Sequence, residues 1–269
     1  MAAGAGRQLT RHKGAAVSAA WSRDARTLAF LDQTGALHTV DVATGRITQA
    51  FGAIWEPGKP TWSPDGRTLA LAAFKPYSAR FREGLSEILT VDVATGAATY
   101  QPVFPDKSLG TRGDDGPVWS PDGRSLAFVF ASRLWVAPVD ARGAMTAPPR
   151  VLNNEVTDAP TWSGDSSKLL YLCNGHLRLI PAAGGAPVTV PHGIPWAAAK
   201  PKGRVVVRAA RLWQGLTPDV RKDADIVIVG NRVADILPAG SSVADAKVVD
   251  GARATVIPGL VEMHAHRQM

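Results

Sequence analysis

A ten-residue motif that occurs four times constrains the fold of this chain more than any other feature. The copies are WSRDARTLAF from Trp21, WSPDGRTLAL from Trp62, WSPDGRSLAF from Trp119 and WSGDSSKLLY from Trp162, and successive copies begin 41, 57 and 43 residues apart. Periods of about 40 to 45 residues are typical of four-stranded propeller blades, and loop insertions lengthen some of them. The sequence therefore predicts an all-β fold of stacked sheets, which the 26 glycines and 20 prolines, common turn residues, also favour.

A second motif follows each copy of the first and completes the repeat. It reads LHTVDVATGR at Leu37, ILTVDVATGA at Ile88, LWVAPVDARG at Leu134 and LRLIPAAGGA at Leu177. The offset from the first motif is 16, 26, 15 and 15 residues in the four repeats. We expect the extra residues of the second repeat, within FKPYSARFREGLSE, to form a long loop.

Turn residues and apolar runs predict a pair of hairpins in each repeat. In the segment Ser63-Pro64-Asp65-Gly66, proline presets φ for the first turn position and glycine supplies a left-handed residue. The runs that follow, 69–74 and 126–130, are apolar without alternation, as expected for a strand that is covered on both faces. Such a unit cannot bury its own faces, so we expect it to be stable only when stacked on its neighbours.

The motif WSPDGR-x-LA closely resembles the PD40 repeats of TolB-like β-propellers, and the resemblance covers residues 1–196. It implies either a four-bladed propeller, at the lower end of the usual range, or an incomplete one. The opening segment GRQLTRHKG resembles the outer strand of a preceding blade. This strand either closes the ring against the last blade or belongs to a chain that begins further upstream, and we favour the second. Open blades would expose sheet faces that favour aggregation or pairing with a partner.

The recurring tryptophans and Asp-Gly pairs each allow a structural and a functional interpretation. Trp21, Trp62, Trp119 and Trp162 could stack on a ligand, but their recurrence at one point of every repeat favours a packing role. The Asp-Gly pairs could bind calcium, but turn chemistry explains them with fewer assumptions. We expect both sets to be structural.

After residue 196 the repeats stop and a different pattern begins. Residues 205–207, 225–229, 233–237 and 247–249 are typical of short strands. The pair Gly230-Asn231 lies between two of them and is a strong signal for a two-residue hairpin.

The closing segment VIPGLVEMHAH contains two histidines, His264 and His266, one residue apart. On a β-strand they would point to the same side, with Cα atoms roughly 6.5 Å apart, so both imidazoles could reach one divalent ion. Imidazole ligands favour zinc over calcium or magnesium. An HxH pair alone is a weak signal, but its place after an apolar strand and a PGL turn strengthens it.

The stretch 203–269 resembles the amidohydrolase superfamily. The resemblance implies a partial β-sandwich at 197–255, then the first strand of a (β/α)8 barrel at 256–269 that ends in the metal ligands His264 and His266. Glu262 departs mildly from relatives that carry aspartate before this motif. In a complete enzyme one or two metal ions, expected to be zinc, would activate water to attack a C–N or related bond of a small-molecule substrate. A barrel needs roughly 250 residues, so we expect this chain to lack a complete site, to be inactive alone, and to contribute no catalytic residue.

Two alternatives to an amidohydrolase fragment come from other classes. The propeller could be a protein- or peptide-binding module without catalytic activity. It could also precede a serine peptidase domain, but the chain has no G-x-S-x-G nucleophile elbow.

The charge pattern does not favour nucleic acid. The net charge is +7 and the pI about 9.9, yet basic residues are scattered singly rather than gathered in a stripe with aromatics. The single cysteine, Cys173, lies in an apolar run and is expected to be a buried structural thiol. Neither a signal peptide nor a membrane span is visible in the sequence. The family resemblance implies export to the periplasm or the medium, whereas no signal peptide is visible, so the sequence does not assign a compartment.

Overall fold

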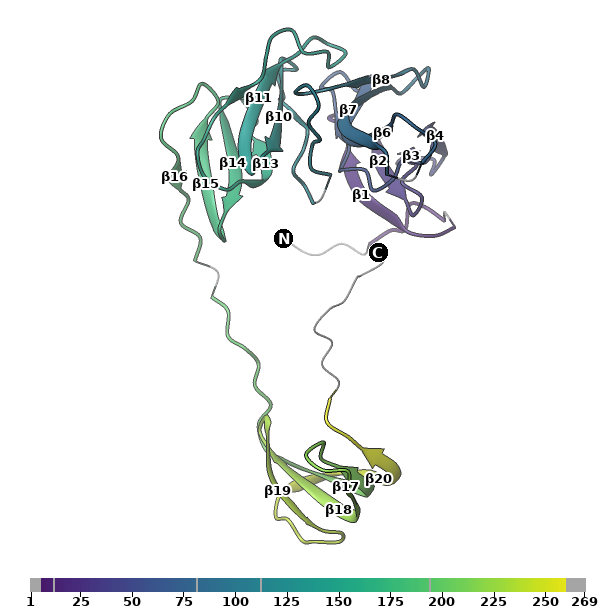
Figure 1. Ribbon diagram of the computed structural model, residues 1–269, viewed down its shortest axis with the longest axis vertical. Helices are drawn as coiled ribbons and strands as arrows, with labels where there is room; N and C mark the ends of the chain where they lie inside the picture. The colour runs from purple at the N-terminus through teal and green to yellow at the C-terminus, as the bar shows by residue number, and fades with distance from the viewer. Residues whose placement is uncertain (1–5, 12, 81, 112, 194, 260–269) are drawn as a thin grey trace. The chain divides into compact units, whose positions relative to one another are not determined.

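The computed structural model describes residues 6–259 except 12, 81, 112 and 194. Strands are the only regular elements among the described residues. Contacts between Cα atoms divide the chain into two compact units, residues 1–192 and 193–269 (Figure 1). The first unit contains the repeats, and we call it the repeat unit; the second we call the C-terminal unit.

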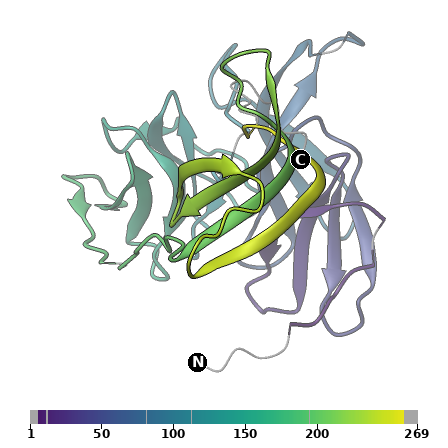
Figure 2. The ribbon, with the colours of Figure 1, turned by 90° about the horizontal axis from the view of Figure 1, so that it is seen from below.

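Each of the four repeats forms one antiparallel sheet, which we call a blade, and the strands of a blade neighbour one another in chain order. The four sheets follow one another from purple to green in Figure 2. The all-β prediction is thereby confirmed. Blade 1 comprises β1 (Ala16–Trp21), β2 (Thr27–Asp32), β3 (Leu37–Asp41) and β4 (Ile47–Phe51); blade 2 comprises β5 (Thr61–Trp62), β6 (Thr68–Pro76), β7 (Gly84–Asp92) and β8 (Ala98–Gln101); blade 3 comprises β9 (Val118–Trp119), β10 (Ser125–Phe130), β11 (Arg133–Pro138) and β12 (Arg150–Val151); blade 4 comprises β13 (Asp158–Trp162), β14 (Lys168–Cys173), β15 (His176–Pro181) and β16 (Val188–Thr189).

A serine and an aspartate hold the first turn of every blade. In blade 2, Ser63 Oγ donates to Asp65 Oδ1 over 2.6 Å, and the same carboxylate oxygen accepts the backbone N–H of Arg67. Gly66 has φ +71° and its N–H donates to the Ser63 carbonyl. The serine–aspartate bond recurs in the other three blades. The Asp-Gly pairs are therefore turn residues, as the sequence predicts.

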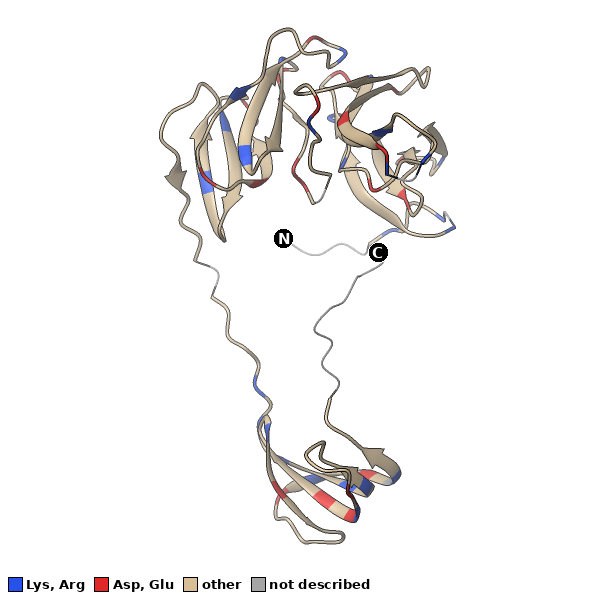
Figure 3. Ribbon diagram, in the orientation of Figure 1, with Lys and Arg blue, Asp and Glu red and all other residues tan. Residues whose placement is uncertain are grey.

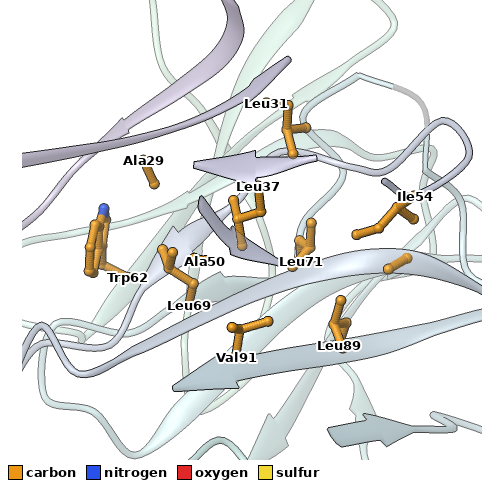
Figure 4. Close-up of a cluster of buried hydrophobic side chains, with 11 residues drawn as sticks. Ala29, Leu31, Leu37, Ala50, Ile54, Trp62, Leu69, Leu71, Leu89 and Val91 are labelled. Atoms are coloured by element: carbon orange, nitrogen blue, oxygen red, sulfur yellow. The ribbon is translucent and has the colours of Figure 1, made fainter. Parts of the chain in front are cut away.

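Successive blades pack through three hydrophobic cores. We call the face of a blade that meets the blade before it the leading face, and the opposite face the trailing face. In the first core, Leu69 and Leu71 on the leading face of β6 pack against Ala29 and Leu31 on the trailing face of β2 (Figure 4). The second and third cores repeat this arrangement between blades 2 and 3 and between blades 3 and 4. Both faces of an interior blade are therefore covered, which explains its apolar strands.

The insertion in blade 2 differs from the expected long loop. Strands β6 and β7 pair from Thr68↔Asp92 to Pro76↔Gly84, so most of the extra residues lengthen a hairpin. Only residues 77–83 lie between the two strands. The extension is fixed by side chains as well, because Lys75 Nζ lies 3.2 Å from Glu87 Oε2.

The opening segment is not the strand that the sequence suggests. The described residues from 6 to 15 belong to no strand and lie against blade 1. The Arg7 guanidinium donates to the Val42 carbonyl, and the Leu9 carbonyl lies beside Gly45. The segment therefore contacts the turn between β3 and β4.

The C-terminal unit is a single four-stranded sheet in the order β19-β18-β17-β20, where β17 is Arg204–Trp213, β18 is Val220–Val229, β19 is Arg232–Pro238 and β20 is Ala246–Val256. All four predicted strands are present, each longer than expected, and Gly230-Asn231 joins β18 to β19. β17 and β20 are parallel. The described residues of this unit form this one sheet, and Ile257–Gly259 form no strand.

Candidate functional site

The innermost strands of all four blades border one cavity of about 570 Å³. Trp21, Trp62 and Trp119 are among the residues that line it, together with the charged residues Lys59 and Asp114. The cavity lies where the repeats converge, so residues up to about 140 positions apart in the chain meet there.

Two of the repeated tryptophans join their blade to the preceding blade by a hydrogen bond. The Trp62 indole N–H donates to the Ala20 carbonyl of blade 1 over 3.0 Å, and the Trp162 indole N–H donates to the Val118 carbonyl of blade 3 over 3.0 Å. In both pairs the acceptor is the residue just before the tryptophan of the preceding blade. Trp119 departs from this pattern and donates to its own Gly123 carbonyl.

Trp21 is the exception to the expected packing role. Its relative exposure is 56%, against 8% for Trp62 and 5% for Trp119. Among the described residues no sheet lies before blade 1, so the joint that holds Trp62 and Trp162 has no described counterpart at Trp21. The packing interpretation is confirmed for Trp62, Trp119 and Trp162, which pack in or against the cores between blades, and is wrong for Trp21, which is exposed and lines the cavity.

The inner edge of blade 1 also differs from the others. Pro60, Pro117 and Pro160 each lie two residues before the tryptophan of blades 2, 3 and 4, and all three line the cavity. Proline has no N–H, so it prevents pairing at a strand edge. The equivalent residue of blade 1 is Ala19, which keeps its N–H. Blade 1 is thus the blade whose inner edge is not blocked by proline.

Charged residues of opposite sign flank the cavity. Lys59 Nζ lies 3.3 Å from Asp114 Oδ2, and both side chains are substantially exposed. The Arg23 guanidinium donates to the Pro121 carbonyl over 2.8 Å, which connects blade 1 to blade 3. Exposed ion pairs contribute little stability, so Lys59 and Asp114 can separate and pair with charged groups of a ligand instead.

Asp115 follows this pair and is half-buried. Burial raises the pKa of its carboxyl group, the neighbouring Asp158 and Asp114 raise it further, and a hydrogen bond from the Ala159 N–H opposes both effects. The carboxyl group of Asp115 therefore retains its proton to a higher pH than an ordinary aspartate does.

The predicted metal ligands His264 and His266 lie outside the described residues. Within the described part of the chain, no group of three or more His, Cys, Asp or Glu side chains is placed to hold a metal ion. Cys173 is buried as expected, and burial raises the pKa of its thiol. Lys and Arg residues are scattered along the described chain in both units (Figure 3). None of the described residues forms a helix that could span a membrane.

The comparisons with known proteins found similar sequences and similar folds, but no family model matches the sequence. A stretch of 61 residues, 22% of the chain, is 34% identical to the Tol-Pal system protein TolB of Francisella tularensis, in subspecies mediasiatica and tularensis alike. The match covers 14% of those relatives.

Solved structures extend the likeness to the fold. TolB from Acinetobacter baumannii aligns over 80% of this chain and 52% of its own, with 17% identity and a TM-score of 0.51. An oligogalacturonate lyase in complex with manganese aligns over 73% of this chain and 58% of its own, with 18% identity and a TM-score of 0.51. The chain thus spans somewhat over half the length of these structures. The repeat unit has a TolB-like β-propeller fold.

Proposed function

We propose that the repeat unit is a binding module for an extended polypeptide segment, which it holds in the central cavity along the inner edge of β1. The proposal concerns a protein or peptide partner and no catalytic step. It rests on one observation: Trp21 is exposed at the position where Trp62 and Trp162 each hold a backbone carbonyl of a neighbouring strand.

The geometry of these joints favours a peptide over a small molecule. A segment lying beside β1 would offer its own carbonyl to the Trp21 indole, as Ala20 does to Trp62. Ala19 adds a backbone N–H for strand pairing, the mode by which many domains bind extended peptides. Lys59 and Asp114 would contact side chains of the segment at the mouth of the cavity.

Selection from a random-sequence peptide display library would test this function. We expect peptides that bind the full chain to lose at least tenfold in affinity for Trp21→Ala, because buried aromatic anchors supply much of the energy of such interfaces. Failure to select any peptide, or selection only of peptides that bind Trp21→Ala equally well, would refute the proposal.

Ala19→Pro provides a matched variant, since it gives blade 1 the proline found in the other three blades. Ser18 has φ +54°, and Ala159, which precedes Pro160 in blade 4, has φ +48°. Both residues lie at a bulge in the same register. We therefore expect Ala19→Pro to fold normally and to weaken peptide binding. Unchanged binding would exclude pairing along β1.

A second candidate function comes from the C-terminal unit. Its four strands cover the strand segments expected from the sequence pattern, and β20 ends at Val256, shortly before the histidine motif. His264 and His266 would supply two zinc ligands of an amidohydrolase. Catalytic zinc sites use three protein ligands, so this pair does not complete one.

Isothermal titration of the full chain with zinc, beside the double variant His264→Ala/His266→Ala, tests this second candidate. We expect weak binding that the double variant loses, and no hydrolase turnover with zinc added. Equal zinc binding by both chains would show that the two histidines are not zinc ligands. Metal-dependent turnover would show that the chain contains a complete catalytic site.

A further inference from the structure

The trailing face of blade 4 carries an apolar surface that none of the other three described blades covers. Leu170 pairs with Leu179 and Leu172 with Leu177 across β14 and β15, so four leucines adjoin on one face. Val188, the partner of Leu179 on β16, extends it. Leu172 is 39% exposed and Val188 is 56% exposed. We call these five residues the leucine face.

The leucine face is not shaped for another blade of the same series. In blades 1, 2 and 3 the eighth residue after the motif tryptophan is alanine (Ala29, Ala70 and Ala127), and each is fully buried beneath large side chains of the next blade. Blade 4 has Leu170 at this position. Its larger side chain occupies the space that a following leucine would need, so a further repeat would be overpacked there.

The other end of the repeat unit is already covered. Phe30 and His38 pair across β2 and β3 on the leading face of blade 1, yet they are only 3% and 6% exposed. His38 Nε2 lies 3.1 Å from Asp32 Oδ2. The rings of Phe30 and His38 stack with their centroids 5.3 Å apart. Head-to-tail association of copies would have to reopen this buried face, whereas association through the leucine face requires no such change.

We propose that the leucine face binds the leucine face of a second copy of this chain, which forms a two-fold symmetric dimer. Charges on the same face complement each other under this symmetry. Lys168 lies at one end of β14, and Asp158, the partner of Leu172, lies at the other. A two-fold axis that lies in the interface, perpendicular to the strands, and passes at the level of Leu170 exchanges the two ends of β14. Lys168 of each copy then faces the end of the other copy's sheet where Asp158 lies. Two inner sheet faces packed in this way form a sandwich.

Sedimentation of the full chain over a range of concentrations is the first test. We expect the mass to rise from 28.3 kDa towards twice that value. Leu172→Glu should raise the dimer Kd at least tenfold, since each interface would receive two buried carboxylates. Val151→Glu is the matched control, because Val151 is 42% exposed on a strand of blade 3, and it should leave the Kd unchanged.

Charge reversal tests the symmetry of the dimer. Lys168→Glu and Asp158→Lys should each weaken association, and the double variant should restore it, because both changed residues then meet across the same axis. A chain that stays monomeric, equal effects of Leu172→Glu and Val151→Glu, or no restoration in the double variant would overturn the proposal. Protection of Leu172 from hydroxyl radicals in a monomer would show that another part of the chain covers the face.

Discussion

Strands β6 and β14 have the same place in their blades but different surroundings. In β6 every residue from Thr68 to Ala73 is buried, whereas β14 alternates between buried and more exposed residues. Leu169, Tyr171 and Cys173 are covered by blade 3, while Leu170 and Leu172 face outward. The comparison shows that the sequence of a repeat determines its four-stranded sheet, whereas the adjacent blades determine which of its residues are buried.

The same difference separates Trp62 from Trp21. Both tryptophans open a copy of the same motif, yet one indole is locked into the joint with the preceding blade and the other is exposed in the cavity. The two binding surfaces that we propose, Trp21 and the leucine face, are both places where no described blade forms a joint.

The largest difference in stability should separate a leucine in a core between blades from a leucine on the exposed face of blade 4. Leu71→Ala in the first core should lower the free energy of unfolding by about 2–5 kcal/mol, because it leaves a cavity among fully buried side chains. In dilute solution Leu172→Ala should cost about 0.5 kcal/mol or less. Urea unfolding of both variants measures the difference, and equal losses would show that blade 4 is covered on both faces.

The two tryptophans should differ by a smaller amount. Trp62→Phe removes the indole N–H that binds the Ala20 carbonyl and should cost about 1–3 kcal/mol. Trp21→Phe should change stability by about 0.5 kcal/mol or less. Thermal unfolding gives both values; a larger loss at Trp21 would mean that its ring is part of a packed joint.

The smallest expected effect is the change of stability with pH. The turn aspartate Asp165 and the half-buried Asp115 should contribute to it in opposite directions, because the pKa of one is lowered and that of the other is raised. Hydrogen bonds from Ser163 and Ser167 lower the pKa of Asp165 to about 2, so its stabilising effect is present above an unfolded pKa of about 3.9 and is lost as the pH falls towards 2. The pKa of Asp115 is raised, so its ionised form destabilises the fold at neutral pH.

The measurement for this prediction is the urea midpoint at pH 7 and at acid pH. Asp165→Asn should reduce the loss of stability in acid. Asp115→Asn should raise the midpoint at pH 7 and have little effect in acid. If Asp115→Asn destabilises the chain at pH 7, the carboxylate has a stabilising partner and our assignment is wrong.

Much of the repeat unit could be predicted from its sequence. The motif period gives the blades, and Ser63-Pro64-Asp65-Gly66 gives their turns, because these features depend on local chemistry. The exposure of Trp21 could not be read from its motif, which is nearly the same as the motif at Trp62. The signal is its place as the first copy, together with Ala19 where the other blades have proline.

The remaining differences arise from contacts between distant residues. The cavity forms where four inner strands converge, and no local pattern shows that convergence. The longer β6–β7 hairpin depends on pairing of Phe74 with Ser86 and Lys75 with Leu85 across a segment rich in polar residues. Leu170 was visible as a departure from alanine, but its meaning required knowing which face of β14 is covered.

The central claim is that a bound peptide contacts Trp21 while the other motif tryptophans remain structural. Fluorine NMR of the chain labelled with 5-fluorotryptophan, titrated with a peptide selected for binding, tests it most directly. The resonance that disappears in Trp21→Phe should shift on binding, and those assigned to Trp62, Trp119 and Trp162 by the same substitution should stay nearly fixed. A Trp21 resonance that is unchanged at saturation would contradict the account.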